Sequence, residues 1–318
     1  MIGNKDFLLC GAVAAGPALE GGVVHTGMRA DAGAVDSVRI RGGKIHVHVI
    51  GNSSGKISPK GICGSGIVDL IAELFLEGWI DIRGKFSPEK TNLIQKREGQ
   101  LCIEYAPGLY FYQKDIDEFI LTKAAAHIMV EIMLRESGLE LNQADRFYAA
   151  GSFGKYVSVE SAITIGMYPD MEREKMINAG NSSLEGAQKL LLNKELLADI
   201  DQILEEMTYI QFAEVDDFLE QMVAPQALPH TDYKKYATVM EKLKTRSKMK
   251  FDVLGLLAAC SYALDCVEAE LIKVTNNHSK RVAYMAVCTA EKNGYTGSKP
   301  AGSGRVCIAA RQCSGTIY

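Results

Sequence analysis

Apolar positions recur along the chain with two different periods, which predicts an alternation of strands and helices. An apolar run at residues 7–13 has the length of a strand, and residues 147–150 are expected to form a short buried strand. Residues 37–40 and 44–50 alternate polar and apolar side chains on either side of a Gly-Gly pair. This second pattern is typical of a β-hairpin with a two-residue turn.

Two stretches have the 3.6-residue spacing of a helix that buries one face. The first is expected to begin at Ser65 as N-cap and to stop at Gly78, with its apolar face made by Ile67, Leu70, Ile71, Leu74 and Phe75. The second spans residues 115–137 and ends at Gly138. His127 lies on the apolar face of this second helix, and we interpret it as a hydrogen-bonded core histidine rather than a metal ligand.

The β/α alternation continues beyond the second long helix. Capping residues predict shorter helices that start at Ser158 and at Asn181, the latter with a capping box. A helix is expected at residues 196–207, a strand at 208–212 and a further helix from Asp216. The alternation of strands and helices predicts an α/β domain.

After Asp232 the sequence changes character. Residues 233–250 are rich in lysine and are interpreted as a linker or an exposed helix. We therefore divide the chain into an α/β domain at 1–243, a helical segment at 244–295 and a tail at 296–318. The tail loses all periodicity, so it is predicted to be disordered or to result from a frameshift.

The composition of the chain argues against nucleic-acid binding and against a membrane protein. With 47% hydrophobic and 23% charged residues, the chain has the composition of a globular protein, and its net charge of -4 gives no reason to expect nucleic acid. We expect no membrane span, because charges interrupt the apolar stretches. The N-terminal sequence lacks the pattern of a signal peptide, so we expect a cytoplasmic protein.

Metal chemistry has little support in the residue pattern. The eight cysteines form no CxxC pair, and none has the spacing of a zinc knuckle or a ferredoxin cluster loop. His46 and His48 share one face of a predicted strand, but no cysteine or carboxylate accompanies them at ligand spacing. We interpret this pair as part of a solvent-facing strand.

The chain contains three glycine-rich turns beside apolar runs: GPALEGG at 16–22, GICGSG at 61–66 and AAGSFG at 149–154. Glycine adopts positive φ and lets the backbone approach a ligand closely. Repeated glycine turns next to strands and helices are therefore typical of α/β proteins that bind phosphates and nucleosides. One such turn is weak support, because glycine also simply builds turns.

The residues around these turns occur in seven ordered blocks that resemble one family. The blocks are CGAVAAGPALEGG (10–22), GMRADAGAV (27–35), GICGSGIVDLIAEL (61–74), QKDIDEFILTKAA (113–125), AAGSFGKYVSVESAITIGMYP (149–169), AGNSSLEGA (179–187) and PHTD (229–232). They resemble the C-terminal ATPase domain of the reductive activators of corrinoid proteins. These activators belong to the actin, hexokinase and acetate kinase superfamily. The resemblance implies a partial actin-like, ribonuclease H-like fold with a mixed sheet and flanking helices.

The same resemblance implies a function, cofactors and a partner. Family members use ATP and magnesium to return the inactive cob(II)amide of a methyltransferase system to cob(I)amide, and usually carry an N-terminal iron-sulfur module. The partner implied is therefore a corrinoid protein. The resemblance places the nucleotide at Gly151, Ser152, Phe153 and Gly154, with Glu20, Gly21, Gly22, Gly64, Ser65 and Gly66 nearby.

Two parts of the family pattern are missing from this chain. The superfamily holds phosphates and magnesium with two Asp-x-Gly-Thr hairpins, and the sequence contains neither. The iron-sulfur module is also absent, so the chain resembles an internal start within a longer gene. We therefore expect a nucleotide-binding fragment of an activator that lacks hydrolytic activity by itself.

Two alternative functions stay open. Residues 251–295 resemble the opening helices of HD-type metal phosphohydrolases, and His278 falls at the position of their first metal-binding histidine. The His-Asp pair that should follow does not occur, so any metal site there is weak and incomplete. A non-catalytic interaction fragment is the other alternative.

Overall fold

The computed structural model describes residues 1–12, 24–53, 55–215 and 217–248. One compact unit spans Met1–Arg246, and a second spans Ser247–Tyr318. The predicted HD-like helices, the predicted tail and His278 therefore lie outside the described residues. Among the helices that are described, none is long and apolar enough to cross a membrane.

Two three-stranded sheets contribute to the main core of the first unit. Their strand orders are β4(Lys44–Val49)-β3(Ala34–Arg41)-β5(Gly61–Ile62) and β6(Ile94–Arg97)-β7(Gln100–Ala106)-β8(Leu109–Tyr112). The predicted hairpin is confirmed: β3 and β4 are antiparallel, and Arg41 pairs with Lys44 across the Gly-Gly turn. His46 and His48 are exposed on β4, as expected for a solvent-facing strand.

The other described strands form two smaller sheets that contain parallel pairs. Their orders are β1(Ile2–Gly3)-β2(Leu8–Gly11)-β11(Met207–Ile210) and β10(Met176–Gly180)-β9(Phe147–Ala150). Strand β11 is parallel to β2, and β9 is parallel to β10, whereas β1 is antiparallel to β2. The mixture of parallel and antiparallel pairs confirms the predicted α/β class.

The prediction that β9 is buried is wrong. Its residues alternate between half-buried and exposed, and Tyr148 is 57% exposed. The alternation means that one face of β9 is partly covered, whereas the face that carries Tyr148 and Ala150 is exposed. The strand expected at 208–212 is shifted, because Phe212 begins a short 3₁₀ turn and its buried ring packs in a second, smaller core.

The two long helices occur where the apolar spacing predicts them. Helix α1 spans Gly64–Leu76, and helix α2 spans Gln113–Ser137 with Gly138 as a left-handed C-cap. The expected N-cap of α1 is wrong, because the helix begins at Gly64 and Cys63 occupies the cap position, two residues before Ser65. Ser65 instead donates its hydroxyl to the carbonyl oxygen of Asp36 on β3, at 2.9 Å.

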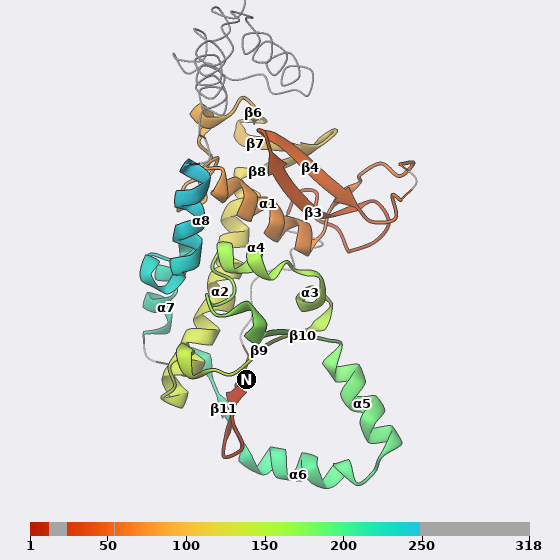
Figure 1. Ribbon diagram of the computed structural model, residues 1–318, viewed down its shortest axis with the longest axis vertical. Coiled ribbons are helices and arrows are strands. Elements are labelled where there is room, and N and C mark those ends of the chain that lie inside the picture. Colours follow the sequence, from red (N-terminus) through yellow and green to blue (C-terminus); the bar gives the residue numbers. More distant parts are fainter. Residues whose placement is uncertain (13–23, 54, 216, 249–318) are drawn as a thin grey trace, which may run out of the picture. The chain divides into compact units, whose positions relative to one another are not determined.

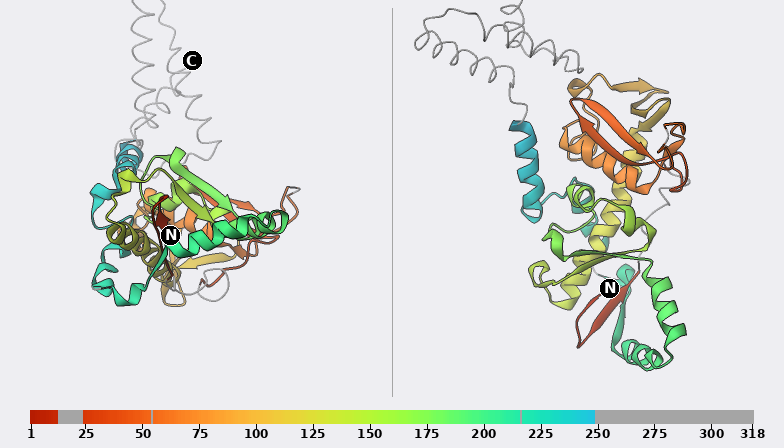
Figure 2. Two further views of the ribbon diagram at one scale, coloured as in Figure 1. Left: turned by 90° about the horizontal axis from the view of Figure 1, so that it is seen from below. Right: turned by 45° about the vertical axis from the view of Figure 1, so that its right-hand side comes forward.

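The remaining helices are shorter: α3(Gly151–Tyr156), α4(Val159–Thr164), α5(Ser182–Leu192), α6(Leu196–Glu206), α7(Phe218–Gln221) and α8(Ala237–Lys248). The predicted N-caps are confirmed, since Ser158 and Asn181 each accept a backbone N–H with the side chain. The capping box predicted at Asn181 is wrong, because the third helical residue is Leu184 and Glu185 follows it. Asp216 lies outside the described residues, and α7 begins at Phe218. No residue of α5 or α6 is buried, and both helices stand away from the main core (Figure 2).

Helix α8 corrects the interpretation of residues 233–250 as a linker or exposed helix. It lies beside α2 and α4 (Figure 1), and Val239 and the preceding Tyr236 are among the buried residues of the main core. Arg246 also donates hydrogen bonds to Glu73 and Glu77 on α1. Lys234, Lys235 and Lys244 are exposed and contribute to the polar composition of this segment, but Tyr236 and Val239 join the core.

Candidate functional site

The turn between β9 and α3 is the glycine turn with the clearest ligand-binding geometry. Gly151 has a φ of +82°, and a Cβ built on it would meet nothing within 4 Å. Gly154 differs, because a Cβ there would lie 2.9 Å from the carbonyl carbon of Ala149. Gly154 therefore lets α3 pack closely on β9, whereas Gly151 provides a turn with open space beside it.

Strand β10 supports this turn from the neighbouring position in the sheet. The parallel register aligns Ala150 with Gly180, so the carboxyl ends of both strands meet at one edge. Asn178 donates its side-chain amide to the Lys155 carbonyl at 2.6 Å and accepts the Gly180 N–H at 3.1 Å. The carboxyl edge of parallel strands is where open α/β sheets bind ligands.

Helix α3 also presents aromatic rings to solvent. Phe153 is 37% exposed and Tyr156 is 65% exposed. Exposed aromatic faces beside a glycine turn can stack with a flat, apolar ring such as a nucleobase. Ser152 lies in the same turn, between Gly151 and Phe153.

The second glycine turn is a packing junction in the structure. Gly64, Ser65 and Gly66 are all buried at the start of α1. A Cβ on Gly66 would lie 2.3 Å from the carbonyl oxygen of Val35, so only glycine fits at this distance from β3. Helix α1 contacts α3 directly, which relates the two glycine turns in space. Nucleotide contact by these three residues stays a prediction.

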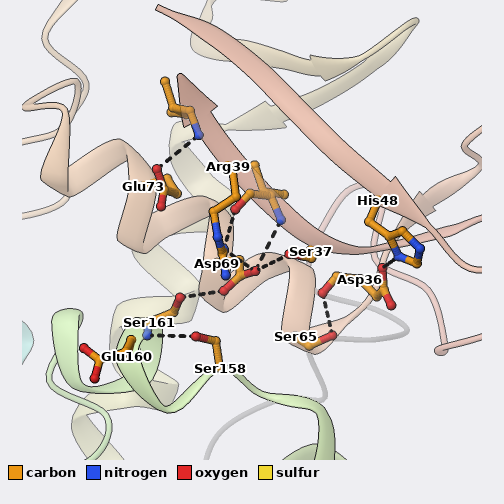
Figure 3. A network of polar contacts seen from close by, with 12 residues as sticks. Asp36, Ser37, Arg39, His48, Ser65, Asp69, Glu73, Ser158, Glu160 and Ser161 are labelled. Atoms are coloured by element: carbon orange, nitrogen blue, oxygen red, sulfur yellow. Dashed lines mark hydrogen bonds and ion pairs between the residues drawn. The ribbon is translucent and has the colours of Figure 1, made fainter. Parts of the chain in front are cut away.

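Asp69 connects the elements that surround these turns, and sequence reasoning missed it (Figure 3). This buried carboxylate on α1 accepts hydrogen bonds from Ser161 on α4 at 2.5 Å and from Ser37 on β3 at 2.8 Å. It also pairs with Arg39 at 2.6 Å. The available signal was the pair of acidic residues Asp69 and Glu73 inside an otherwise apolar helix, because a buried carboxylate needs partners.

The third glycine turn lies outside the described residues, and with it Glu20, Gly21 and Gly22. The structure fixes the chain immediately after it. The N–H of His25 donates to the Asp115 carboxylate at 2.9 Å, and the N–H of Tyr112 donates to the same carboxylate at 2.8 Å. Burial raises the pKa of Asp115 above its usual value, although these two backbone donors oppose the shift.

Comparison with models of known protein families shows which family this chain belongs to. Residues 1–240 match the C-terminal domain of RACo, the ASKHA domain. The chain belongs to this family. The predicted actin-like fold and the resemblance to reductive activators of corrinoid proteins are therefore confirmed. The match ends before the segment that resembles an HD domain.

Two similar proteins have names that refer to the activation or reduction of corrinoids or corrinoid proteins. The chain is 34% identical, over 69% of its length, to the corrinoid activation enzyme RamQ of Eubacterium limosum. It is 28% identical, over 64% of its length, to a [Co(II) methylated amine-specific corrinoid protein] reductase of Methanosarcina barkeri. These matches span 39% and 38% of the two relatives.

A solved structure that resembles this chain is also named as a reductive activator. The chain superimposes on a reductive activator for a corrinoid, iron-sulfur protein with a TM-score of 0.67 and 37% identity. The similarity covers 74% of this chain and 39% of that protein. The chain thus corresponds to less than half the length of each of these three relatives.

Proposed function

We propose that this chain is the nucleotide-binding half of an ATP-dependent reductive activator of corrinoid proteins. The β9–α3 turn is the observation that carries the proposal. Gly151 combines a left-handed φ with open space at the carboxyl edge of a parallel strand pair. A nucleoside can approach the backbone there, because no side chain stands between them.

The proposal assigns different roles to the residues around the turn. Gly151 and Ser152 give backbone contact to the nucleoside, and Phe153 offers a ring face to the base. Gly154 holds α3 against β9, so its role is to fix the shape of the turn. Glu20, Gly21, Gly22, Gly64, Ser65 and Gly66 are proposed to lie near the nucleotide, as the family resemblance implies.

The partner follows from the names of the relatives. All three compared proteins are named for activation or reduction of a corrinoid protein, and we extend that partner class to this chain. ATP is the proposed nucleotide. We propose an iron-sulfur cluster only for a separate module, because this chain lacks the cysteine spacing that such a cluster needs.

Hydrolysis of ATP is expected to be absent from this chain alone. The sequence contains neither Asp-x-Gly-Thr hairpin, and we propose no magnesium ligand among the described residues. Without a carboxylate to organise metal and water, the γ-phosphate lacks the groups that stabilise its transfer. Phosphate release by the purified chain is the measurement. Magnesium-dependent release that Gly151→Ala abolishes would show that the missing hairpins are dispensable.

Calorimetric titration of the full chain with ATP tests the binding proposal. Gly151→Ala is the test variant, and Gly43→Ala in the β3–β4 turn is its matched control. Both glycines have positive φ, +82° and +74°, and both have open space where the Cβ would go. Each substitution therefore costs a similar roughly 1–2 kcal/mol of backbone strain. Only Gly151→Ala should weaken ATP binding, by at least about tenfold.

Equal affinities for the two variants would remove the assignment of the nucleotide to this turn.

The alternative function, an HD-type metal phosphohydrolase, has no support among the described residues, because His278, its only candidate metal ligand, lies outside them.

A further inference from the structure

Three ligand-type side chains meet inside the first unit. His127 and Glu131 lie one turn apart on α2, and His230 comes from the PHTD segment. One ligand atom from each lies within 4.8 Å of the others. His127 is 5% exposed and His230 is 3% exposed, and the Nε2 atom of each is buried without a hydrogen-bond partner. Two unpartnered buried imidazole nitrogens require an explanation.

His127 is already arranged as a metal ligand. Its Nδ1 lies 3.1 Å from the carbonyl oxygen of Gly166 and 3.1 Å from the hydroxyl of Tyr236. A carbonyl only accepts, so Nδ1 carries a proton, and in the neutral ring Nε2 keeps its lone pair. A ring N–H bonded to a backbone carbonyl is the usual second contact of a metal-binding histidine.

Glu131 lies at the right separation from that lone pair. Its Oε1 is 3.2 Å from His127 Nε2, yet the two atoms do not form a hydrogen bond with good geometry. Two ligands at about 2.0–2.1 Å from a tetrahedral zinc ion are separated by roughly 3.3 Å. The observed distance thus matches one edge of such a site. The carboxylate is also 26% exposed, which gives a path for an ion.

His230 is held in place by a buried lysine. The ammonium of Lys123, one turn before His127 on α2, donates to the carbonyls of Pro225, Ala227 and Pro229 at 2.6, 2.8 and 2.5 Å. These bonds fix the segment before His230 against α2. The Nδ1 of His230 accepts the backbone N–H of Asp232 at 2.9 Å.

We propose that His127, Glu131 and His230 bind a divalent transition-metal ion of the zinc class. Two imidazole nitrogens and one carboxylate form a donor set that zinc uses in proteins, with the fourth position left for water. The ion would connect α2 to the PHTD segment that precedes α8. It would also give His230 Nε2 a partner, and it would replace the contact of His127 Nε2 with Glu131 by coordination of both groups.

Binding requires one rearrangement at His230. In the metal-free protein its Nδ1 accepts a hydrogen bond, so the proton of the neutral ring is on Nε2. Coordination through Nε2 moves that proton to Nδ1, with no net proton released from this ring, and the Asp232 N–H loses its acceptor. Lys235, which pairs with Glu131, must also yield part of its contact with the carboxylate.

The alternative occupant is a single water molecule. Water can accept from His230 Nε2–H and donate to His127 Nε2 and Glu131, without any change of tautomer. The two occupants differ in what they predict for added zinc. A water site gives no stoichiometric zinc binding that depends on these three residues.

The test uses the full chain, reduced and stripped with a chelator, titrated with Zn²⁺ by calorimetry and followed by metal analysis. His127→Asn and His230→Asn keep a polar group near the Nδ1 position and remove the Nε2 ligand. Glu131→Gln removes the carboxylate charge at nearly constant size. His48→Asn, on exposed β4, is the matched control.

The proposal predicts one zinc ion per wild-type chain and per His48→Asn chain. It predicts at least about tenfold weaker binding in each of the three site variants. In amide NMR, zinc should shift the Asp232 N–H away from its hydrogen-bonded position. No stoichiometric zinc, or zinc that all three variants retain, would overturn the site and leave the water as its occupant.

Discussion

Lys123 allows a quantitative test of how α2 holds the PHTD segment. Its side chain is fully buried, and its ammonium group donates to three carbonyl oxygens at 2.5–2.8 Å. Lys123→Met keeps most of the apolar stem and removes all three donors. The residues that carry the carbonyls, Pro225, Ala227 and Pro229, are also buried, so water cannot replace the lost donors.

The magnitude follows from two opposing effects. Three buried carbonyls left without a partner cost about 1–3 kcal/mol each. Removing a buried charge returns several kcal/mol, because burial disfavours the ammonium ion. Burial lowers the pKa of Lys123 to about 7, although the nearby negative charge of Glu131 opposes this shift. We expect a net loss of about 2–4 kcal/mol in the free energy of unfolding.

Urea denaturation followed by circular dichroism measures this loss. Lys85→Met is the matched control, because Lys85 pairs with Asp117 at 2.6 Å on the exposed surface. That substitution should cost about 0–1 kcal/mol. Lys123→Gln, which keeps an amide donor, should fall between the two and remains measurable if Lys123→Met does not fold. A Lys123→Met protein as stable as Lys85→Met would refute the reasoning.

Two further predictions concern packing and charge. Gly66→Ala should destabilise the protein by about 1–3 kcal/mol in urea denaturation, because its Cβ would lie 2.3 Å from the Val35 carbonyl oxygen. Gly186→Ala in α5 should instead stabilise the protein slightly, because a Cβ there would meet nothing within 4 Å. A change of the same sign in the free energy of unfolding for both variants would contradict the argument. Arg173 and Lys242 hold the pKa of Glu160 at about 2, although partial burial opposes this. A folded-state pKa below the unfolded value of about 4.5 gives stability above pH 4.5 that is lost towards pH 2. Glu160→Gln should remove about 1 kcal/mol of that pH dependence, after allowance for solvent screening, whereas Glu172→Gln on the exposed surface should not.

The sequence predicted those elements whose signals are local. Helix α2 was predicted because its apolar spacing and its terminal Gly138 lie within one continuous stretch. The β3–β4 hairpin was predicted for the same reason, since its Gly-Gly turn determines the pairing of the strands. Family resemblance then supplied the fold, which these local patterns could not specify.

Burial depends on neighbours far along the chain, and there the predictions failed. Tyr148 on β9 is exposed because it lies on the open face of a strand that is only half-buried on its other face. Val239 is buried because α8 packs on the core despite its lysines. His127 was correctly interpreted as a hydrogen-bonded core residue, but its unpartnered Nε2 becomes apparent only when His230 is placed beside it.

The location of the bound nucleotide is the central claim, and hydrogen–deuterium exchange measures it directly. The full chain is compared with and without a non-hydrolysable ATP analogue at a saturating concentration. We predict slower exchange of the backbone amides of residues 149–157, which include the Gly151 turn and α3. Amides of β6, β7 and β8 serve as the internal control and should not change. Protection confined to any other segment, with residues 149–157 unaffected, would contradict the account.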